Sequence, residues 1–136
     1  MDTQLEAYYM KQQESSIPGE DLVKKECLKE YCDNDPELLS IFIDHAKANL
    51  RELLEMIPGF RKEKDVINLK KLIHKVSPTI EIIGRQDLKV SLQLMKRKWE
   101  NDQYYWDERY LLQEIEEIIA SLEAIKQQET SFTSSY

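Results

Sequence analysis

The sequence predicts an all-α protein, and three observations lead to this prediction. Apolar residues recur at intervals of three and four, which is the period of a helix that buries one face. Only 3 Gly and 4 Pro interrupt 136 residues. No β-branched alternation is sustained over the length of a strand. We therefore expect an antiparallel up-down-up-down four-helix bundle with an additional N-terminal capping helix.

Breaker residues divide the chain into three parts. Residues 1–19 form an N-terminal extension, which can hold a short helix over 4–13 and either packs on the bundle as a lid or stays loose. Residues 20–126 form the helical bundle. The polar residues 127–136 are expected to be a disordered tail.

Each expected helix of the bundle has its own start or stop signal. The capping helix covers 20–32, with Leu22, Val23, Cys27 and Leu28 inward. Asp35 caps the next helix and Pro36 suits its first position, and the helix runs to about residue 57 before the pair Pro58-Gly59. Asp65 caps a helix that stops at Gly84. The fourth helix of this series begins near residue 86, and the last helix spans about 106–126.

Composition and charge exclude several classes of function. The chain has 19 basic and 26 acidic residues, a net charge of −7, which argues against binding to nucleic acid or to anionic lipid. No apolar run approaches the roughly 20 residues that span a bilayer. The polar start Met1-Asp2-Thr3-Gln4 is unlike a signal peptide, so we expect a cytoplasmic protein. Cys27 and Cys32 lack metal or redox spacing and are expected to be reduced thiols.

The helix over residues 66–83 carries His74, the residue that is best suited to a chemical role. Its apolar stripe is made by Leu69, Ile73, Val76, Ile80 and Ile83. His74 projects about 140° away from the centre of that stripe, and we therefore expect it in solvent.

The neighbours of His74 favour an approaching anion. Lys70 and Lys71 lie about one turn before it and Lys75 adjoins it, so an anion meets positive charge at the ring. Ser77 and Pro78 on the next turn are compact and leave room above it. A neutral imidazole is a nucleophile near pH 7.

The run His74-Lys75-Val76-Ser77-Pro78, with Gly84 beyond it, resembles the active helix of histidine phosphotransfer domains of multistep phosphorelays. That family has an aliphatic residue two positions after the histidine, usually Lys three after, a small residue four after and Gly ten after. Val76 and Gly84 match, and Pro78 stands where Gly is commonest. Ser77 replaces the usual Lys, whose role by resemblance is to steady the phosphoryl group. Lys70 or Lys71 is expected to supply that charge instead, and we expect Lys70, Lys71, Lys75 and Ser77 together to support the phosphoryl group.

The resemblance covers roughly residues 20–126 and implies a phosphocarrier. His74 would accept a phosphoryl group from the phospho-aspartate of a response-regulator receiver domain, or of a hybrid histidine kinase, and pass it to another receiver. The chain itself would need no cofactor, because the Mg²⁺ belongs to the receiver. No Gly-rich phosphate loop is present, so we expect a relay without ATP-dependent kinase activity, which is not an enzyme in the usual sense.

A partner surface is expected around His74. Ile67, Pro78 and Glu81 share its side of the helix, and Ile41 and His45 on the preceding helix project about 120–160° from the core. Whether Ile41 serves an interface or is a scattered surface residue stays open. His45 is the rival nucleophile, but no lysine precedes it on its own face.

Other functions receive less support from the residues. Neither histidine has the Glu of a Glu-x-x-His metal pair, so no metal site is expected. The principal alternative is a helical adaptor that binds receivers or another signalling partner without carrying phosphate, and the Ser77 departure is its best support. The cluster Tyr104, Tyr105, Trp106 and Tyr110 fits either a core at the end of the bundle or a patch for a partner.

Overall fold

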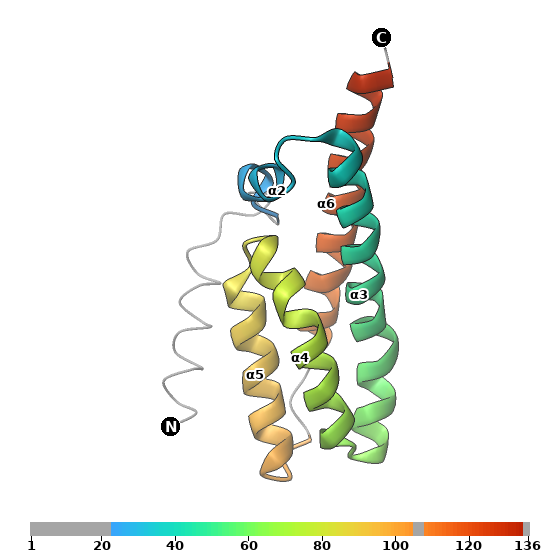
Figure 1. The fold of residues 1–136 in the computed structure, drawn as a ribbon. Helices are drawn as coiled ribbons and strands as arrows, with labels where there is room; N and C mark the ends of the chain where they lie inside the picture. The colour runs from blue at the N-terminus through green and yellow to red at the C-terminus, as the bar shows by residue number, and fades with distance from the viewer. Residues whose placement is uncertain (1–22, 105–107, 135–136) are drawn as a thin grey trace.

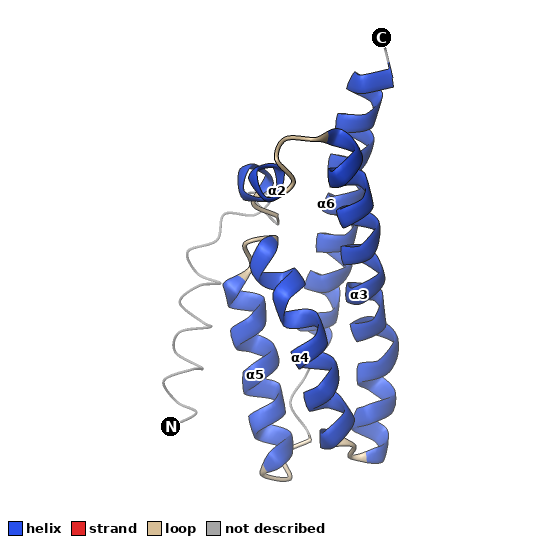
Figure 2. Cartoon of the chain, viewed as in Figure 1, coloured by secondary structure: helices blue, strands red, loops and turns tan. Residues whose placement is uncertain are grey.

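The computed structural model describes residues 23–104 and 108–134, with side chains described as far as residue 129. Its helices are α2 (Lys25–Tyr31), α3 (Pro36–Glu63), α4 (Val66–Ile82), α5 (Gln86–Glu100) and α6 (Arg109–Ser134). These described residues contain no strand (Figure 2). The all-α prediction is confirmed. The expected N-terminal extension, with its possible helix over 4–13, lies outside the described residues.

The four long helices alternate in direction (Figure 1). α3 packs against both α4 and α6, and α4 packs against α5 and α2, as in a helical bundle. The short helix α2 lies across one end of the bundle, above the end of α4 (Figure 1). Within the described ranges, no helix is both long and apolar enough to cross a membrane.

The core is made by the stripes that the helical period predicts. On α4 the residues Leu69, Ile73, Val76, Ile80 and the following Ile83 are all buried. The other helices bury residues of the same kind: Leu39, Ile43, Ala46, Leu50, Leu53 and Ile57 of α3, Leu88, Leu92, Met95 and Trp99 of α5, and Leu111, Ile115, Ile118, Leu122 and Ile125 of α6. Burial of this apolar area is the main force that holds the helices together.

Predicted caps set three helix ends. The Asp35 side chain accepts hydrogen bonds from the backbone N–H groups of Glu37 (2.9 Å) and Leu38 (3.5 Å) at the start of α3. Asp65 accepts one from Asn68 N–H (3.1 Å) at the start of α4. Gly84 follows α4 with a φ of 79°, a left-handed conformation that glycine adopts without steric cost.

The expected end of α3 at Pro58-Gly59 is wrong, because the helix continues to Glu63. Pro58 costs the helix one hydrogen bond, but the last turn has compensating contacts. Phe60 packs against the core and Arg61 pairs with Glu108 of the connection before α6. Lys64 then adopts a left-handed conformation, and Asp65 N–H donates to the Phe60 carbonyl (2.8 Å), which closes the helix.

The predicted bounds of the last helix also require correction. α6 begins at Arg109, not at 106, and runs to Ser134, so the expected disordered tail is helical over 127–134. Contacts with α2 explain this extension. Glu129 of α6 pairs with Lys25 (3.2 Å) and Lys29 (3.7 Å), and Lys25 also donates to the side chain of Gln128 (3.0 Å).

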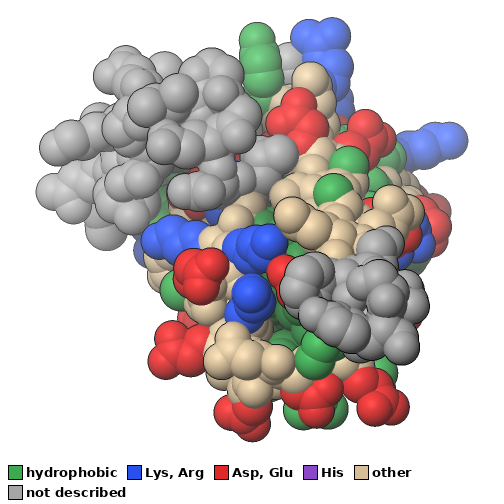
Figure 3. Space-filling model, turned by 90° about the horizontal axis from the view of Figure 1, so that it is seen from above, with side chains coloured by type: hydrophobic (Ala, Val, Ile, Leu, Met, Phe, Trp, Pro, Cys, Tyr) green, Lys and Arg blue, Asp and Glu red, His purple; other side chains and the backbone are tan. Residues whose placement is uncertain are grey.

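Cys27 was expected to point inward and is exposed, whereas Cys32 is buried. α2 is only seven residues long and lies across the end of the bundle, so it buries one short stripe, Leu28 and Cys32. Burial and the nearby carboxylates of Asp33 and Asp35 raise the pKa of the Cys32 thiol. Viewed from above, this end carries basic and acidic side chains close to one another (Figure 3).

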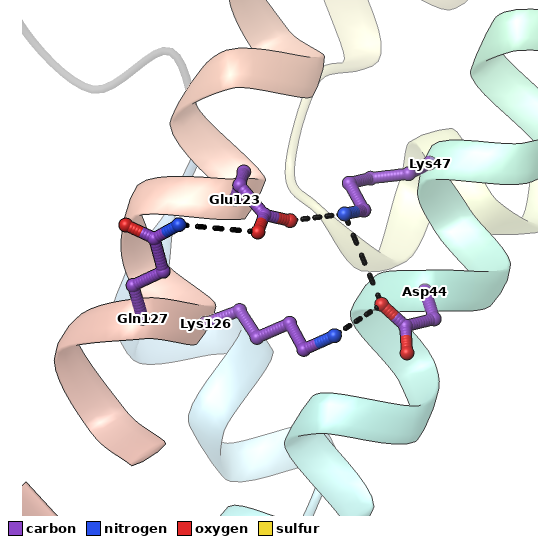
Figure 4. A network of polar contacts seen from close by, with 5 residues as sticks. All are labelled: Asp44, Lys47, Glu123, Lys126 and Gln127. Carbon is purple, nitrogen blue, oxygen red and sulfur yellow. Dashed lines mark hydrogen bonds and ion pairs between the residues drawn. The ribbon is translucent and has the colours of Figure 1, made fainter. Parts of the chain in front are cut away.

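A network of charged side chains joins α3 to α6 (Figure 4). Lys47 of α3 pairs with Glu123 of α6 and with Asp44 (3.8 Å), and Lys126 of α6 donates to Asp44 (2.7 Å). The hydrogen bond and charge of Lys126 lower the pKa of Asp44, and Lys47 lowers that of Glu123 in the same way. The network lies along the seam between the two longest described helices.

Candidate functional site

α4 presents His74 on its outer side. The neighbours Ile73 and Val76 are buried, whereas His74 is exposed, as the helical period predicts. Pro78 lies inside the helix, four residues after His74. Because proline has no N–H, the His74 carbonyl lacks its usual partner in the helix. The exposure predicted for His74 is therefore confirmed, and its chemical role remains a prediction.

We call the exposed row Ile67, Lys71, His74, Pro78 and Glu81 the His74 ridge; all five residues are exposed. Ile67 is 67% exposed, which is high for a large aliphatic side chain. Glu81 pairs with Lys89 of α5. The ridge thus combines apolar surface with charge along one side of α4, a composition that suits contact with another protein.

The four residues predicted to support a phosphoryl group differ in their surroundings. Lys70 and Lys71 are exposed, and the structure gives neither an ion pair within the described part of the chain. The Lys71 charge contributes to a lowered pKa of Asp65, after the larger effect of hydrogen bonds from Asn68. Both lysines can therefore turn toward an anion at His74.

Lys75 and Ser77 are already engaged. Lys75 pairs with Glu52 of α3 (2.8 Å). The Ser77 hydroxyl donates to the Ile73 carbonyl (2.7 Å), one turn earlier in its own helix. A hydroxyl has one proton to donate, so in this arrangement Ser77 has none to offer a phosphoryl oxygen.

His45 and Ile41 lie on α3 and are both exposed, Ile41 by 61%. His45 is linked to α4 through a polar chain. Its Nε2 lies 3.4 Å from Asn49 Nδ2, and Asn49 donates to the hydroxyl of Thr79 at 3.0 Å. Thr79 follows Pro78 in α4, so this series of polar contacts from His45 ends at the residue after a member of the His74 ridge.

The sequence reasoning missed Asn49, Thr79 and Glu52. Asn49 and Thr79 are buried and form a polar contact between α3 and α4. One signal was present, because Asn49 lies at the edge of the apolar face of α3, between Ala46 and Leu53. A polar side chain at such a position usually finds a hydrogen-bond partner in the folded protein.

The described residues hold no group of three or more His, Cys, Asp or Glu side chains placed to bind a metal ion. The aromatic cluster is divided by the structure. Tyr104 packs against the core and against Trp99, with ring centres 5.5 Å apart, whereas Tyr110 is 73% exposed. Tyr105 and Trp106 lie outside the described residues.

No family model, no curated protein and no solved structure matches this chain.

Proposed function

We propose that this protein is a cytoplasmic phosphorelay intermediate that carries a phosphoryl group on His74. The observation that carries the proposal is the exposed position of His74 in the middle of the His74 ridge, close in sequence to the exposed Lys70 and Lys71. The proposal also assigns the described helices to the antiparallel four-helix bundle of histidine phosphotransfer domains, with α2 as its capping helix.

The proposed reaction requires little from this chain beyond a placed nucleophile. A ring nitrogen of His74 attacks the phosphorus of an aspartyl phosphate on a receiver domain. The bond between phosphorus and the aspartate oxygen breaks, and its electron pair leaves with the carboxylate. A second receiver's aspartate then attacks the phosphorus in the same way and regenerates His74. Positioning and neutralisation of charge supply most of the catalysis in such transfers.

Lys70 and Lys71 are the proposed sources of positive charge on this chain. They precede His74 by four and three residues, the spacings at which helical side chains adjoin. Mg²⁺ on the receiver would neutralise the remaining phosphoryl oxygens. The proposed contacts with the receiver are Ile67, Pro78 and Glu81 of α4 and Ile41 and His45 of α3.

The adaptor alternative is favoured by two contacts in the structure. Lys75 is paired with Glu52 and the Ser77 hydroxyl is bonded to Ile73, so two of the four proposed phosphate-supporting groups are occupied. An adaptor would bind the same partners through the same ridge and leave His74 unmodified.

Transfer from phosphorylated receiver domains of the same organism tests the proposal. The wild-type chain, His74→Gln and His45→Gln are each mixed with labelled receiver, and the acid-labile label on the chain is measured. We expect label on the wild type and on His45→Gln and none on His74→Gln. His45→Gln is a matched control, since both histidines are exposed on neighbouring helices.

Label that persists in His74→Gln and disappears in His45→Gln would show that His45 is the phosphorylated residue and would contradict the proposal for His74. If every cognate receiver binds the wild type without transferring label, the adaptor function replaces the relay.

A further inference from the structure

An exposed apolar patch lies where α2 is followed by the start of α3, at one end of the bundle (Figure 1). Tyr31, the last residue of α2, is 60% exposed, and Leu38 and Ile41 of α3 are 47% and 61% exposed. These are three of the six large hydrophobic side chains that are exposed among the described residues. Single exposed apolar side chains are ordinary, but a group of them indicates an interaction site.

Contacts join the members of this group. The Tyr31 ring packs against the ring of Phe42, with centroids 5.4 Å apart, and Phe42 packs against the hydrophobic core. Leu38 lies three residues before Ile41 and four before Phe42, the spacings at which helical side chains adjoin. We call Tyr31, Leu38, Ile41 and Phe42 the α2–α3 patch. Because Phe42 anchors the patch to the core, a partner loses little free energy in ordering it.

Acidic side chains adjoin the α2–α3 patch. Residues 30–46 contain five acidic residues and no Lys or Arg. Glu30 and Glu37 directly precede Tyr31 and Leu38 in the chain, and both are exposed. Neither glutamate has an ion-pair partner within the described ranges, so both charges are available to a partner. The negative charge beside an apolar surface favours a partner that combines apolar and basic side chains.

This charge disfavours two other occupants. The N-terminal extension, residues 1–19, has apolar residues but carries three acidic residues and one Lys, so it would bring further negative charge to the patch. A second copy of the chain that docks through the same patch would place its own Glu30 and Glu37 against those of the first. Like charges brought together at an interface oppose binding. A basic segment of another protein therefore fits the patch better than either.

We propose that the α2–α3 patch binds an amphipathic helix of a partner protein, with an apolar face flanked by Lys or Arg. The apolar face packs on Tyr31, Leu38 and Ile41, and the flanking cations pair with Glu30 and Glu37. A helix is the fitting shape because the α3 part of the patch is a row of helical side chains, onto which a second helix packs by ridges and grooves. The inference goes beyond the function proposed for His74 and does not depend on it. Ile41 is the one member of the patch that is also a proposed contact with the receiver.

Fluorescence anisotropy of the full chain with three labelled peptides of about 18 residues tests this site. The first peptide has Leu at the helical spacing and Lys elsewhere, the second has the same residues in scrambled order, and the third has Glu in place of Lys. We expect saturable binding of the first peptide, tighter than that of either other peptide by about tenfold or more. The reason is that only the first peptide combines an apolar helical face with positive charge.

Variants of the chain locate the binding. Leu38→Lys and Ile41→Lys should each weaken binding of the first peptide by about tenfold or more, because each places a cation in the patch. Met56→Lys is the matched control, since Met56 is a 40% exposed residue of the same helix outside the patch, and it should leave the affinity within about twofold. His74→Gln should bind the peptide as the wild type does, which separates this proposal from the relay. Circular dichroism of each variant checks that the fold is intact.

Four outcomes would overturn the proposal. Equal binding of the scrambled peptide, or equal losses in Leu38→Lys and Met56→Lys, would reduce the binding to a general attraction to a chain of net charge −7. The absence of saturable binding would leave the patch without this partner. A loss of binding in His74→Gln would place the peptide on the His74 ridge. A dimer in analytical ultracentrifugation that Leu38→Lys dissociates and Met56→Lys does not would identify a second copy of the chain as the occupant.

Discussion

Position 77 shows how one residue alters the chemistry expected of its neighbours. The Ser77 hydroxyl is turned back onto the Ile73 carbonyl, a common arrangement for serine inside a helix. A lysine at this position would extend past the backbone and carry its charge to the surface beside His74. Within the proposed function, the lysines before His74 take over that role.

Ser77→Lys should therefore speed phosphoryl transfer to His74 by about tenfold, because it adds a charge-assisted hydrogen bond to the developing charge in the transition state. The initial rate of labelling from a phosphorylated receiver measures this. Ser77→Ala is the control and should stay within about twofold of the wild type. A large loss in Ser77→Ala would instead mean that the hydroxyl contacts the phosphoryl group.

Asn49 is a second residue whose role depends on its partners. Its side chain is buried, donates to the Thr79 hydroxyl at 3.0 Å and lies 3.4 Å from the His45 ring. We expect Asn49→Ala to lower the free energy of unfolding by about 1–3 kcal/mol, because it leaves buried polar groups without partners. Urea denaturation measures this loss. His45→Ala, at the exposed end of this series of polar contacts, should change stability by less than about 0.5 kcal/mol. Equal losses in the two variants would contradict the role assigned to the buried Asn49 side chain.

At the scale of the helical elements, two glycines have opposite surroundings, because Gly84 follows the end of α4 whereas Gly59 lies inside α3. Gly84 ends α4 with φ at 79°, and a Cβ there would lie 2.7 Å from Lys24 Cδ and 2.8 Å from Lys24 Cβ. Gly59 lies inside α3, and a Cβ there would have no atom within 4 Å. The same substitution is therefore expected to act in opposite directions at the two positions.

Gly84→Ala should destabilise the protein by at least about 1 kcal/mol, through left-handed strain and the clash with Lys24 at the start of α2. Gly59→Ala should stabilise it by about 0.5–1 kcal/mol, because alanine is the better residue inside a helix. Thermal or urea unfolding of the two variants beside the wild type checks both signs. Destabilisation by Gly59→Ala would mean that α3 does end at Pro58-Gly59.

At the scale of the whole molecule, the α3–α6 network links stability to pH. Asp44 and Glu123 have pKa values below their usual 3.8 and 4.5. Their contribution to stability is thus present above the usual values and is lost as the pH falls through the lowered ones. The hydrogen bond from Lys126 to Asp44 raises the pKa of that lysine above its usual 10.5. The contribution of Lys126 to stability is present below the usual pKa of lysine, and it is lost as the pH rises through the raised pKa of Lys126.

Asp44→Asn should accordingly flatten both ends of the curve of unfolding free energy against pH, below about pH 4 and above about pH 10.5, while leaving the fold intact. Urea unfolding at a series of pH values measures the curve. Glu116→Gln, which removes an exposed carboxylate of α6 outside this network, should leave its shape unchanged. A curve for Asp44→Asn that superimposes on the wild type at acid pH would show that the network contributes nothing.

The order of the helices could be predicted from the sequence because the information is local. Apolar spacing and the caps Asp35, Asp65 and Gly84 act within one or two turns, and the structure agrees with them. The exposure of His74 and of the His74 ridge follows from the same period. The end of α3 could not be predicted in this way, because the contact of Arg61 with Glu108 joins residues 47 apart in the sequence.

By itself, then, the sequence determined the helical class, the buried stripes and the outward position of His74, since each depends on neighbours in the chain. Only the tertiary structure decided that Lys75 is paired with Glu52, that α6 extends past residue 126 onto α2, and that Arg61 of α3 pairs with Glu108 just before α6. The physical reason is the same in all three cases. Ion pairs and pockets form between residues that packing brings together. The spacing of residues along one helix does not specify which side chain of another helix will lie opposite.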